Sequence, residues 1–407
     1  MPENVSVLFV DDDPNVLSGL RRRIMSKRPD WKLRFCTSGA EALKNLDLQG
    51  ADVIVSDMRM PEMDGAELLR TVARKYPDTA RILLSGYSDE KAIQSGSAAT
   101  HHFLMKPCSD QDVIHAIERG LILRNYLRDP LLIDILYRMS ATLLWPPVFQ
   151  RLHTILQHKA QSSEKELLEF SRDKPGFIDL AHELARREKL ILPTDTPDMV
   201  ALIDLFGPES IKALCVIWAV HGQQTGFTLD NIEQAIHRSL VLGQMSAEIA
   251  RLDGLSHETI DIVRAAAILC HIGLNIMEQV IPEKVAASRN HADRDHCDII
   301  SAEIGSIGVS HPGVSACLAA LWGFKHEVIE DIAFHHRPEA APTQNSRSLL
   351  IVYAAQHFAR KFGRDSDDRT SKYDRAASFI ARCNAQQKWA LWEQHCASLR
   401  DSLPLAI

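Results

Sequence analysis

Short apolar runs alternate with longer amphipathic stretches over the first 125 residues. Five runs have the length and composition of buried strands: 5–10, 32–36, 52–56, 81–85 and 101–105. The stretches between them, such as 15–27 and 64–75, place apolar residues at helical spacing. This alternation predicts a parallel sheet with helices on both faces. We therefore expect binding groups at the carboxyl ends of the strands.

The pattern changes to helical spacing alone after this region. The helical pattern over 110–128 is interrupted at Asp129-Pro130, because a residue that precedes proline disfavours the helical conformation. A new amphipathic segment covers 131–144, and helical periodicity then continues almost to the end of the chain. We predict an α/β domain over 1–125, a linker helix over 126–145 and an all-α domain over 146–407.

Composition narrows the class of protein. Of the 407 residues, 45% are apolar and 24% charged, and the net charge of −7 comes without a Lys/Arg run, which argues against a nucleic-acid partner. The N-terminal segment does not resemble a signal peptide, and no apolar run is long enough to cross a membrane. The eight cysteines form no CxxC pair. We expect reduced thiols and a cytoplasmic location.

Polar residues follow the predicted strands where each strand ends. The first strand runs into Asp11, Asp12 and Asp13, and the third runs into Asp57. Carboxylates that share one sheet edge repel one another unless a cation lies among them, and a hard divalent ion such as Mg²⁺ suits all-oxygen ligands. A carboxylate can also act as a nucleophile toward a phosphoryl group.

This set of residues resembles the receiver domain of two-component response regulators. The resemblance covers about residues 1–125 and implies a five-stranded, doubly wound parallel sheet with strand order 2-1-3-4-5. It implies that Asp57 is the phosphoacceptor. Asp11, Asp12 and Asp57 would then hold Mg²⁺ together with the backbone carbonyl of Arg59.

The same resemblance assigns roles at the ends of the fourth and fifth strands. Ser85 matches the hydroxyl that contacts the phosphoryl group, Lys106 the lysine that neutralises it, and Phe103 the aromatic switch residue. Taken alone, Ser85 could be a turn residue and Lys106 a solvated charge. Asp13, which precedes Pro14, is more simply explained as a helix cap.

The segment "AAILCHIGL" (265–273) is similar to the metal-binding His-Asp pair of HD phosphohydrolases, but Cys270 and His271 stand in place of the pair. His237 and His311 are candidates for other ligands, and Gln356 stands where a downstream aspartate is expected. Cysteine is a soft ligand, imidazole cannot bridge two metals as a carboxylate does, and glutamine is neutral. We therefore expect no metal ion in this degenerate site.

Two other sequence stretches resemble the HDOD domains, which share the HD fold without its metal site. The stretches "LAALWGFKHEVIEDIAFHHRP" and "WPPVFQRLHTIL" carry this resemblance. It implies a non-catalytic output domain. A histidine on an apolar helix face is more often a hydrogen-bonded core residue than a ligand, which is how we interpret His237, His271 and His311. His335 and His336 resemble a helix C-terminus, where imidazolium complements the helix dipole.

These observations predict a response regulator that is phosphorylated on Asp57 and signals through protein–protein contacts. Its partners would be a sensor histidine kinase and an unknown downstream protein. The alternative is an HD-type cyclic-dinucleotide phosphodiesterase with a degenerate metal site. Segment 131–144 has an apolar face that either docks on the helical domain or pairs with a second chain, and we favour a homodimer. That face is formed by Leu131, Leu132, Ile135, Leu136, Met139 and Leu143.

Overall fold

A computed structural model gives the fold of most of the chain. It describes residues 5–85, 100, 102–106, 108–126, 132, 135, 146–157, 164–190, 199–222, 229–295, 297–343, 346–362 and 377–399. The chain divides into two compact units, one over Met1–Tyr137 with Ala320–Gly323 and the other over Arg138–Ala319 and Phe324–Ile407. The division at Tyr137 falls inside the predicted linker, and the predicted boundaries at 125 and 145 stay predictions.

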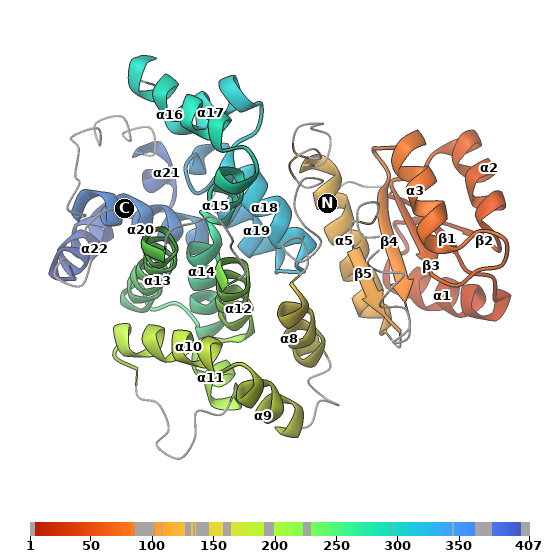
Figure 1. Cartoon of the computed structure of the whole chain (residues 1–407), viewed down its shortest axis with the longest axis horizontal. Coiled ribbons are helices and arrows are strands. Elements are labelled where there is room, and N and C mark those ends of the chain that lie inside the picture. The colour runs from red at the N-terminus through yellow and green to blue at the C-terminus, as the bar shows by residue number, and fades with distance from the viewer. Residues whose placement is uncertain are drawn as a thin grey trace. The chain divides into compact units, whose positions relative to one another are not determined.

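The first unit alternates strands and helices along the chain (Figure 1). Its strands are β1 (Ser6–Val10), β2 (Lys32–Cys36), β3 (Val53–Asp57), β4 (Ala80–Ser85) and β5 (His102–Met105). Its described helices are α1 (Pro14–Lys27), α2 (Gly39–Gln49), α3 (Gly65–Lys75) and α5 (Asp110–Tyr126).

The five strands form one parallel sheet in the order β2-β1-β3-β4-β5. The register pairs Val10 with Ser56 and Asp57 with Leu84, so the carboxyl ends of β1, β3 and β4 lie at one edge of the sheet. The predicted α/β fold and strand order are therefore confirmed. At that edge β1 runs directly into Asp11, and β3 ends on Asp57.

Both faces of the sheet are covered, which explains the nearly continuous apolar runs in the strands. Val7 and Phe9 point to the face packed against α1 and α5. Leu8 and Val10 point to the other face, against α2 and α3. This alternation is the two-residue period of a strand.

Two local features fix the position of the acidic edge: the cap of α1 and the close approach of α3 to β3. Asp13 caps α1 by accepting a hydrogen bond from the backbone nitrogen of Asn15, as its position before Pro14 predicted. Gly65 opens α3 so close to β3 that a Cβ atom there would lie 2.1 Å from the carbonyl oxygen of Asp57. Only glycine fits this approach without moving the backbone of Asp57.

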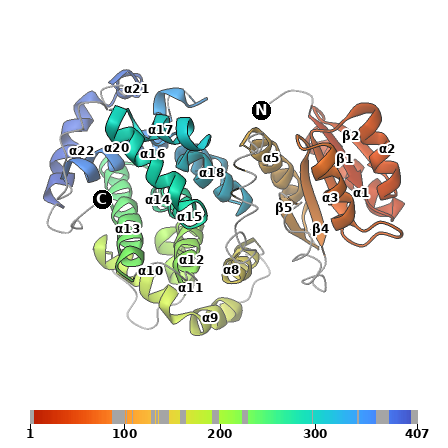
Figure 2. The ribbon, with the colours of Figure 1, turned by 45° about the horizontal axis from the view of Figure 1, so that its top comes forward.

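Every regular element described after residue 146 is helical, as predicted (Figures 1 and 2). The helices are α8 (Pro147–Gln157), α9 (Glu164–Asp173), α10 (Pro175–Arg187), α11 (Met199–Phe206), α12 (Pro208–Gly222), α13 (Leu229–Leu252), α14 (His257–Leu269), α15 (Ile272–Val280), α16 (Pro282–Asp295), α17 (Ile299–Ile307), α18 (His311–Leu321), α19 (His326–Phe334), the 3₁₀ helix η2 (Pro338–Ala340), α20 (Arg347–Phe362), α21 (Ala377–Arg382) and α22 (Gln386–Ser398).

Helix α14 is the centre of the second unit and packs against α12, α13, α19 and α20. The segment His257–Val280, which joins α14 to α15, is long and apolar enough to cross a membrane, but 89% of its most apolar window is buried inside the unit. Such burial is typical of a core helix. Its apolar character is explained by packing on all sides.

Helix α14 also carries a buried ion pair. The guanidinium of Arg264 donates to both carboxylate oxygens of Glu188, at 2.7 and 2.9 Å, and to the carbonyl oxygen of Phe206. The side chains of Arg264 and Glu188 are almost completely buried. A paired and fully hydrogen-bonded geometry is what makes buried charges tolerable, so this pair fixes α14 against α10 and α11.

Only two residues of the predicted apolar face at 131–144 lie in the described part of the chain. Leu132 and Ile135 are helical and buried. The other four positions of that face lie outside the described residues.

Candidate functional site

The acidic edge of the sheet brings together three of the residues that were predicted to meet there, namely Asp11, Asp57 and Lys106. Asp11 and Asp57 are both buried, with 4% and 8% of their surface exposed. The ammonium nitrogen Nζ of Lys106 lies 2.5 Å from Oδ1 of Asp57 and 3.2 Å from Oδ2 of Asp11. One cation therefore bridges two carboxylates that would otherwise repel each other.

The second oxygen of each carboxylate is held by the backbone. Oδ2 of Asp57 accepts a hydrogen bond of 3.0 Å from the backbone nitrogen of Arg59, and Oδ1 of Asp11 accepts one of 3.0 Å from that of Asp13. Burial opposes the charge on Lys106, but the two carboxylates outweigh this effect and raise the pKa of its ammonium group. Lys106 is thus a fixed positive charge at neutral pH.

For the other predicted residues of this edge, the structure gives the backbone position or the exposure but no side-chain contact. Asp12 and Arg59 are exposed next to the buried pair. Ser85 ends β4 in register with Met105, and Phe103 pairs with Leu83. The side chains of Ser85 and Phe103 lie outside the described part of the structure.

At the second candidate site, two of the three substituted positions of the HD pattern contact each other, Cys270 and Gln356. The amide nitrogen Nε2 of Gln356, on α20, donates to Sγ of Cys270 over 2.7 Å. The thiol also lies 3.1 Å from the carbonyl oxygen of Ala267 and 3.2 Å from Nδ1 of His271. Burial raises the pKa of Cys270 to about 12, so this group is a neutral thiol.

His237 is not part of this cluster. It lies on α13, half-buried, with its Nδ1 atom 3.2 Å from Nη2 of Arg187. Burial and the positive charge of Arg187 lower the pKa of His237. His237 thus has a hydrogen-bond partner, and its interpretation as a core residue and not a ligand stays a prediction.

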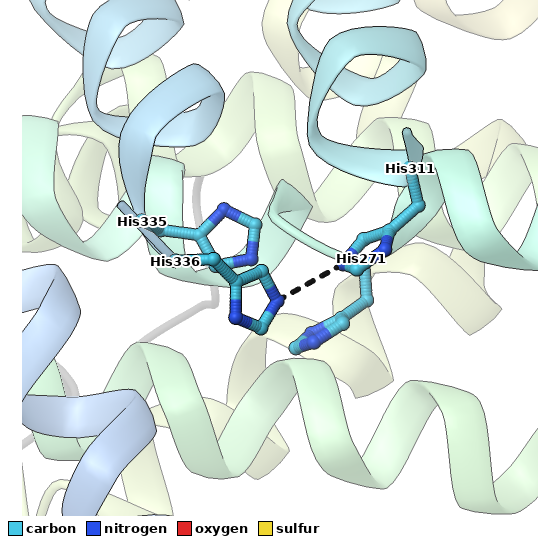
Figure 3. Close-up of side chains that lie close together, drawn as sticks. All are labelled: His271, His311, His335 and His336. Atoms are coloured by element: carbon cyan, nitrogen blue, oxygen red, sulfur yellow. Dashed lines mark hydrogen bonds between the residues drawn. The ribbon is translucent and has the colours of Figure 1, made fainter. Parts of the chain in front are cut away.

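Four other histidines gather in one place. His271 precedes α15, His311 opens α18, and His335 and His336 follow α19, and Figure 3 shows their rings side by side. One ring nitrogen from each lies within 4.8 Å of those of the other three. Nε2 of His336 and Nε2 of His311 are 3.1 Å apart.

Two of these rings are oriented by groups outside the cluster. Nδ1 of His311 lies 2.9 Å from each carboxylate oxygen of Glu303, which is 1% exposed. Nδ1 of His335 lies 2.7 Å from the carbonyl oxygen of Ile332. Because each of these Nδ1 atoms faces an oxygen acceptor, it carries the ring proton, and Nε2 is left as a lone-pair donor.

Burial determines the charge of the cluster. It lowers the pKa of His335 to about 3, and it holds the pKa of His271 and that of His336 well below the usual range, with further contributions from neighbouring histidines. His335 and His336 do lie at the C-terminus of α19, as predicted, with His335 as its C-cap. However, they are neutral imidazoles and not the imidazolium ions that we expected.

Comparisons with known proteins assign both units. Residues 7–118 match the family of response regulator receiver domains, and residues 196–338 match the HDOD domain. The chain carries a receiver domain and an HDOD domain. Together the two domains support a two-component response regulator.

The chain is similar to curated regulators over part of its length. NtrC of Proteus hauseri, a DNA-binding transcriptional regulator, is 28% identical over 50% of this chain and 44% of its own length. The sensor kinase CckA of Brucella abortus is 37% identical over 29% of this chain and 13% of its own length. The chain thus spans less than half the length of these relatives.

Among solved structures, the signal receiver domain of an HD domain-containing protein from Pseudomonas fluorescens Pf-5 is 30% identical. The match covers 31% of this chain and 94% of that one, with a TM-score of 0.29.

Within the HDOD domain, sequence reasoning identified His271 and His311 but did not join His335 and His336 to them. It looked for ligands at the positions of the HD pattern, and that pattern led to His237, Cys270 and Gln356. The sequence does not show which helix ends meet in space. Each of the four histidines lies directly at a helix end, where side chains from different helices can converge.

Proposed function

We propose that this protein is a response regulator that accepts a phosphoryl group on Asp57. The observation that carries the proposal is the contact of one cation, Lys106, with the carboxylates of both Asp57 and Asp11 at the carboxyl edge of the sheet. A carboxylate at that edge, held by a backbone N–H and a lysine, is oriented for attack on phosphorus. The receiver family match over 7–118 supports the same conclusion.

In this reaction an oxygen of Asp57 forms a bond to phosphorus, and the bond from phosphorus to the donor's leaving group breaks. Lys106 is placed to neutralise the phosphoryl oxygens, and Ser85 would donate its hydroxyl hydrogen to one of them. The carboxylates of Asp11, Asp12 and Asp57 form an all-oxygen donor set that fits Mg²⁺, with the carbonyl of Arg59 as a further ligand, and the ion would stabilise the negative charge of the phosphoryl group.

Phosphorylation replaces the single negative charge of the Asp57 carboxylate with a phosphoryl group that carries nearly two, at an edge that Lys106 now balances. That change would reposition Ser85 and Phe103 at the ends of β4 and β5. A sensor histidine kinase is the proposed donor.

We propose that the HDOD domain is a non-catalytic output that acts by binding a downstream protein. The HD hydrolytic site needs a carboxylate that bridges two metals. This chain has His271 at that position and a neutral Gln356 at the downstream one. The four-histidine cluster likewise contains no carboxylate.

Two further proposals concern assembly and location. Segment 131–144 would pair with a second chain, although burial of Leu132 and Ile135 within the single chain favours packing inside the chain for those two positions. All eight cysteines are free and five are buried, which suits a reducing cytoplasm.

The experiment that tests phosphorylation uses the full chain with Mg²⁺ and a small phosphodonor such as acetyl phosphate. We expect one acid-labile phosphoryl group per chain, lost in Asp57→Asn. Asp64→Asn is the matched control, because Asp64 is an exposed cap of α3 and asparagine caps helices as well as aspartate. Full labelling of Asp57→Asn would refute the assignment.

A second assay addresses the output domain. Cyclic di-GMP and simple phosphodiesters, incubated with the protein and Mn²⁺, should not be hydrolysed. Hydrolysis that disappears in His271→Ala and persists in His237→Ala would show that the domain is an enzyme instead.

A further inference from the structure

The four clustered histidines of the HDOD domain come from three separate places at helix ends. His271 lies between α14 and α15, His311 begins α18, and His335 and His336 directly follow α19 (Figure 3). Their ring nitrogens lie within 4.8 Å of one another, and three of the four residues are buried. The fold therefore concentrates four nitrogen donors in a small volume of its core.

The lone pairs of this cluster are incompletely used. Nε2 of His335 is buried and has no hydrogen-bond partner among the described residues, and His335 itself is 0% exposed. Nδ1 of the same ring faces the carbonyl of Ile332, so Nε2 is the unprotonated nitrogen. A buried acceptor without a partner is costly, which points to a further group that binds it.

The hydrogen-bonded contact between His311 and His336 brings two further ring nitrogens to the spacing of metal ligands. Glu303 fixes the proton of His311 on Nδ1, so Nε2 of His311 presents a lone pair to Nε2 of His336 at 3.1 Å. That separation is close to the roughly 3.3 Å edge of a tetrahedron whose corners lie about 2.05 Å from a zinc ion. A ligand histidine whose other nitrogen donates to a buried carboxylate is also a common support of metal sites.

We propose that His271, His311, His335 and His336 bind a single divalent transition-metal ion of the zinc type within the HDOD domain. The proposal revises our expectation of a metal-free domain. That expectation considered only the positions at which the HD pattern places ligands. It does not depend on phosphorylation of Asp57.

The donor set determines which ion fits. Imidazole nitrogens suit Zn²⁺ and its neighbours, whereas Mg²⁺ and Mn²⁺ prefer carboxylates. The positive charges of Arg238 and Arg360 act on His271 and oppose any cation, so binding must come from the nitrogen lone pairs, supported by the carboxylate of Glu303 behind His311. Four protein ligands also complete a tetrahedral shell, which is typical of a structural ion and not of a hydrolytic one.

A structural ion here would tie the start of α15, the start of α18 and the end of α19 to one point. Such an ion stabilises the folded state because the ligands are far apart in the unfolded chain. Thermal stability of the HDOD domain should therefore depend on the ion.

The test uses the full chain, stripped with a chelator and then titrated with Zn²⁺ or with Co²⁺ as a spectroscopic probe. We expect one ion per chain by elemental analysis, visible absorption bands of tetrahedral Co²⁺, and a higher melting temperature with Zn²⁺. Mg²⁺ should neither compete at this site nor produce the stabilisation of the HDOD domain.

Substitutions of single residues test which side chains bind the ion. His311→Ala and His335→Ala should lose the Co²⁺ bands, whereas His237→Ala, a histidine outside the cluster, and Asp57→Asn should keep them. If the alanine variants fold poorly, Glu303→Gln preserves the shape of the side chain and should weaken Zn²⁺ binding about 10–100-fold. Failure of the wild type to bind Zn²⁺ or Co²⁺, or unchanged binding in His311→Ala and Glu303→Gln, would overturn the proposal.

Discussion

The side-chain amide of Gln356 donates a hydrogen bond to the thiol of Cys270 over 2.7 Å, which links α20 to the end of α14 in the core of the second, helical unit. These are the two positions at which HD phosphohydrolases would place a histidine and an aspartate of one metal site. They still meet in space in this chain. Their chemistry has changed from metal binding to a hydrogen bond between neutral groups.

This contact predicts a measurable coupling. Cys270→Ala would leave the buried Nε2 of Gln356 without its acceptor, at a cost of about 1–3 kcal/mol in the free energy of unfolding. Gln356→Leu removes the amide and should cost less. The double variant should then cost less than the sum of the two single variants, as measured by urea denaturation. Additive effects would show that the contact contributes nothing.

Gly65 should be intolerant of any side chain. A Cβ atom there would lie 2.1 Å from the carbonyl oxygen of Asp57 and 2.7 Å from a methyl group of Leu83. Gly65→Ala should lower the stability of the receiver domain by about 1–3 kcal/mol and slow phosphorylation, because Asp57 must move.

Gly19 is the matched control for this substitution. In helix α1 the nearest atoms to a Cβ atom at Gly19 belong to the flexible end of Arg23, at 3.9 Å. Gly19→Ala should raise stability by about 0.5–1 kcal/mol. Equal melting temperatures for the two variants would contradict the close packing of α3 on β3.

Removal of one partner of the buried pair of Arg264 and Glu188 should lower the free energy of unfolding strongly. Replacement of both partners by apolar residues should lower it much less. Arg264→Met leaves the carboxylate of Glu188 buried beside Arg251 alone, and should cost about 3–5 kcal/mol. The double variant Glu188→Leu, Arg264→Met should recover most of that loss. A double variant no more stable than Arg264→Met would show that the pair is needed for more than charge balance.

A second ion pair predicts a dependence on pH. Burial opposes the charge of Asp253, but hydrogen bonds from Arg347 and Lys388 outweigh it and lower its pKa below the ordinary value of 3.8. A lowered pKa in the folded state adds stability above pH 3.8, which is lost as pH falls through the lowered pKa. Asp253→Asn should therefore cost about 1.5–3 kcal/mol at pH 7 and progressively less below pH 3.8. A cost that is independent of pH would contradict the ion pair.

The fold of the receiver domain was predictable because its strands are short, apolar and bounded by polar residues. Each predicted strand agrees with the observed one to within a residue, as at Lys32–Cys36 and Ala80–Ser85. The acidic edge followed from the same pattern, since parallel strands end at one side of the sheet.

The HDOD site was less predictable because it depends on contacts between distant helices. Helical periodicity shows that a helix is amphipathic but not which helices meet. The buried pairing of Glu303 with His311 and the approach of His336 to His311 required the three-dimensional structure. The charge of His335 also depends on burial that the sequence did not reveal.

The central claim is that Asp57 alone accepts the phosphoryl group, and borohydride reduction followed by peptide mass spectrometry tests it most directly. Reduction converts a phosphorylated aspartate to homoserine, so the residue is marked where it reacted. After treatment with Mg²⁺ and a phosphodonor, homoserine should appear at position 57 and not at Asp11, Asp12 or Asp13. Homoserine at any of those three positions, or a lack of homoserine at position 57 in phosphodonor-treated protein, would contradict the account.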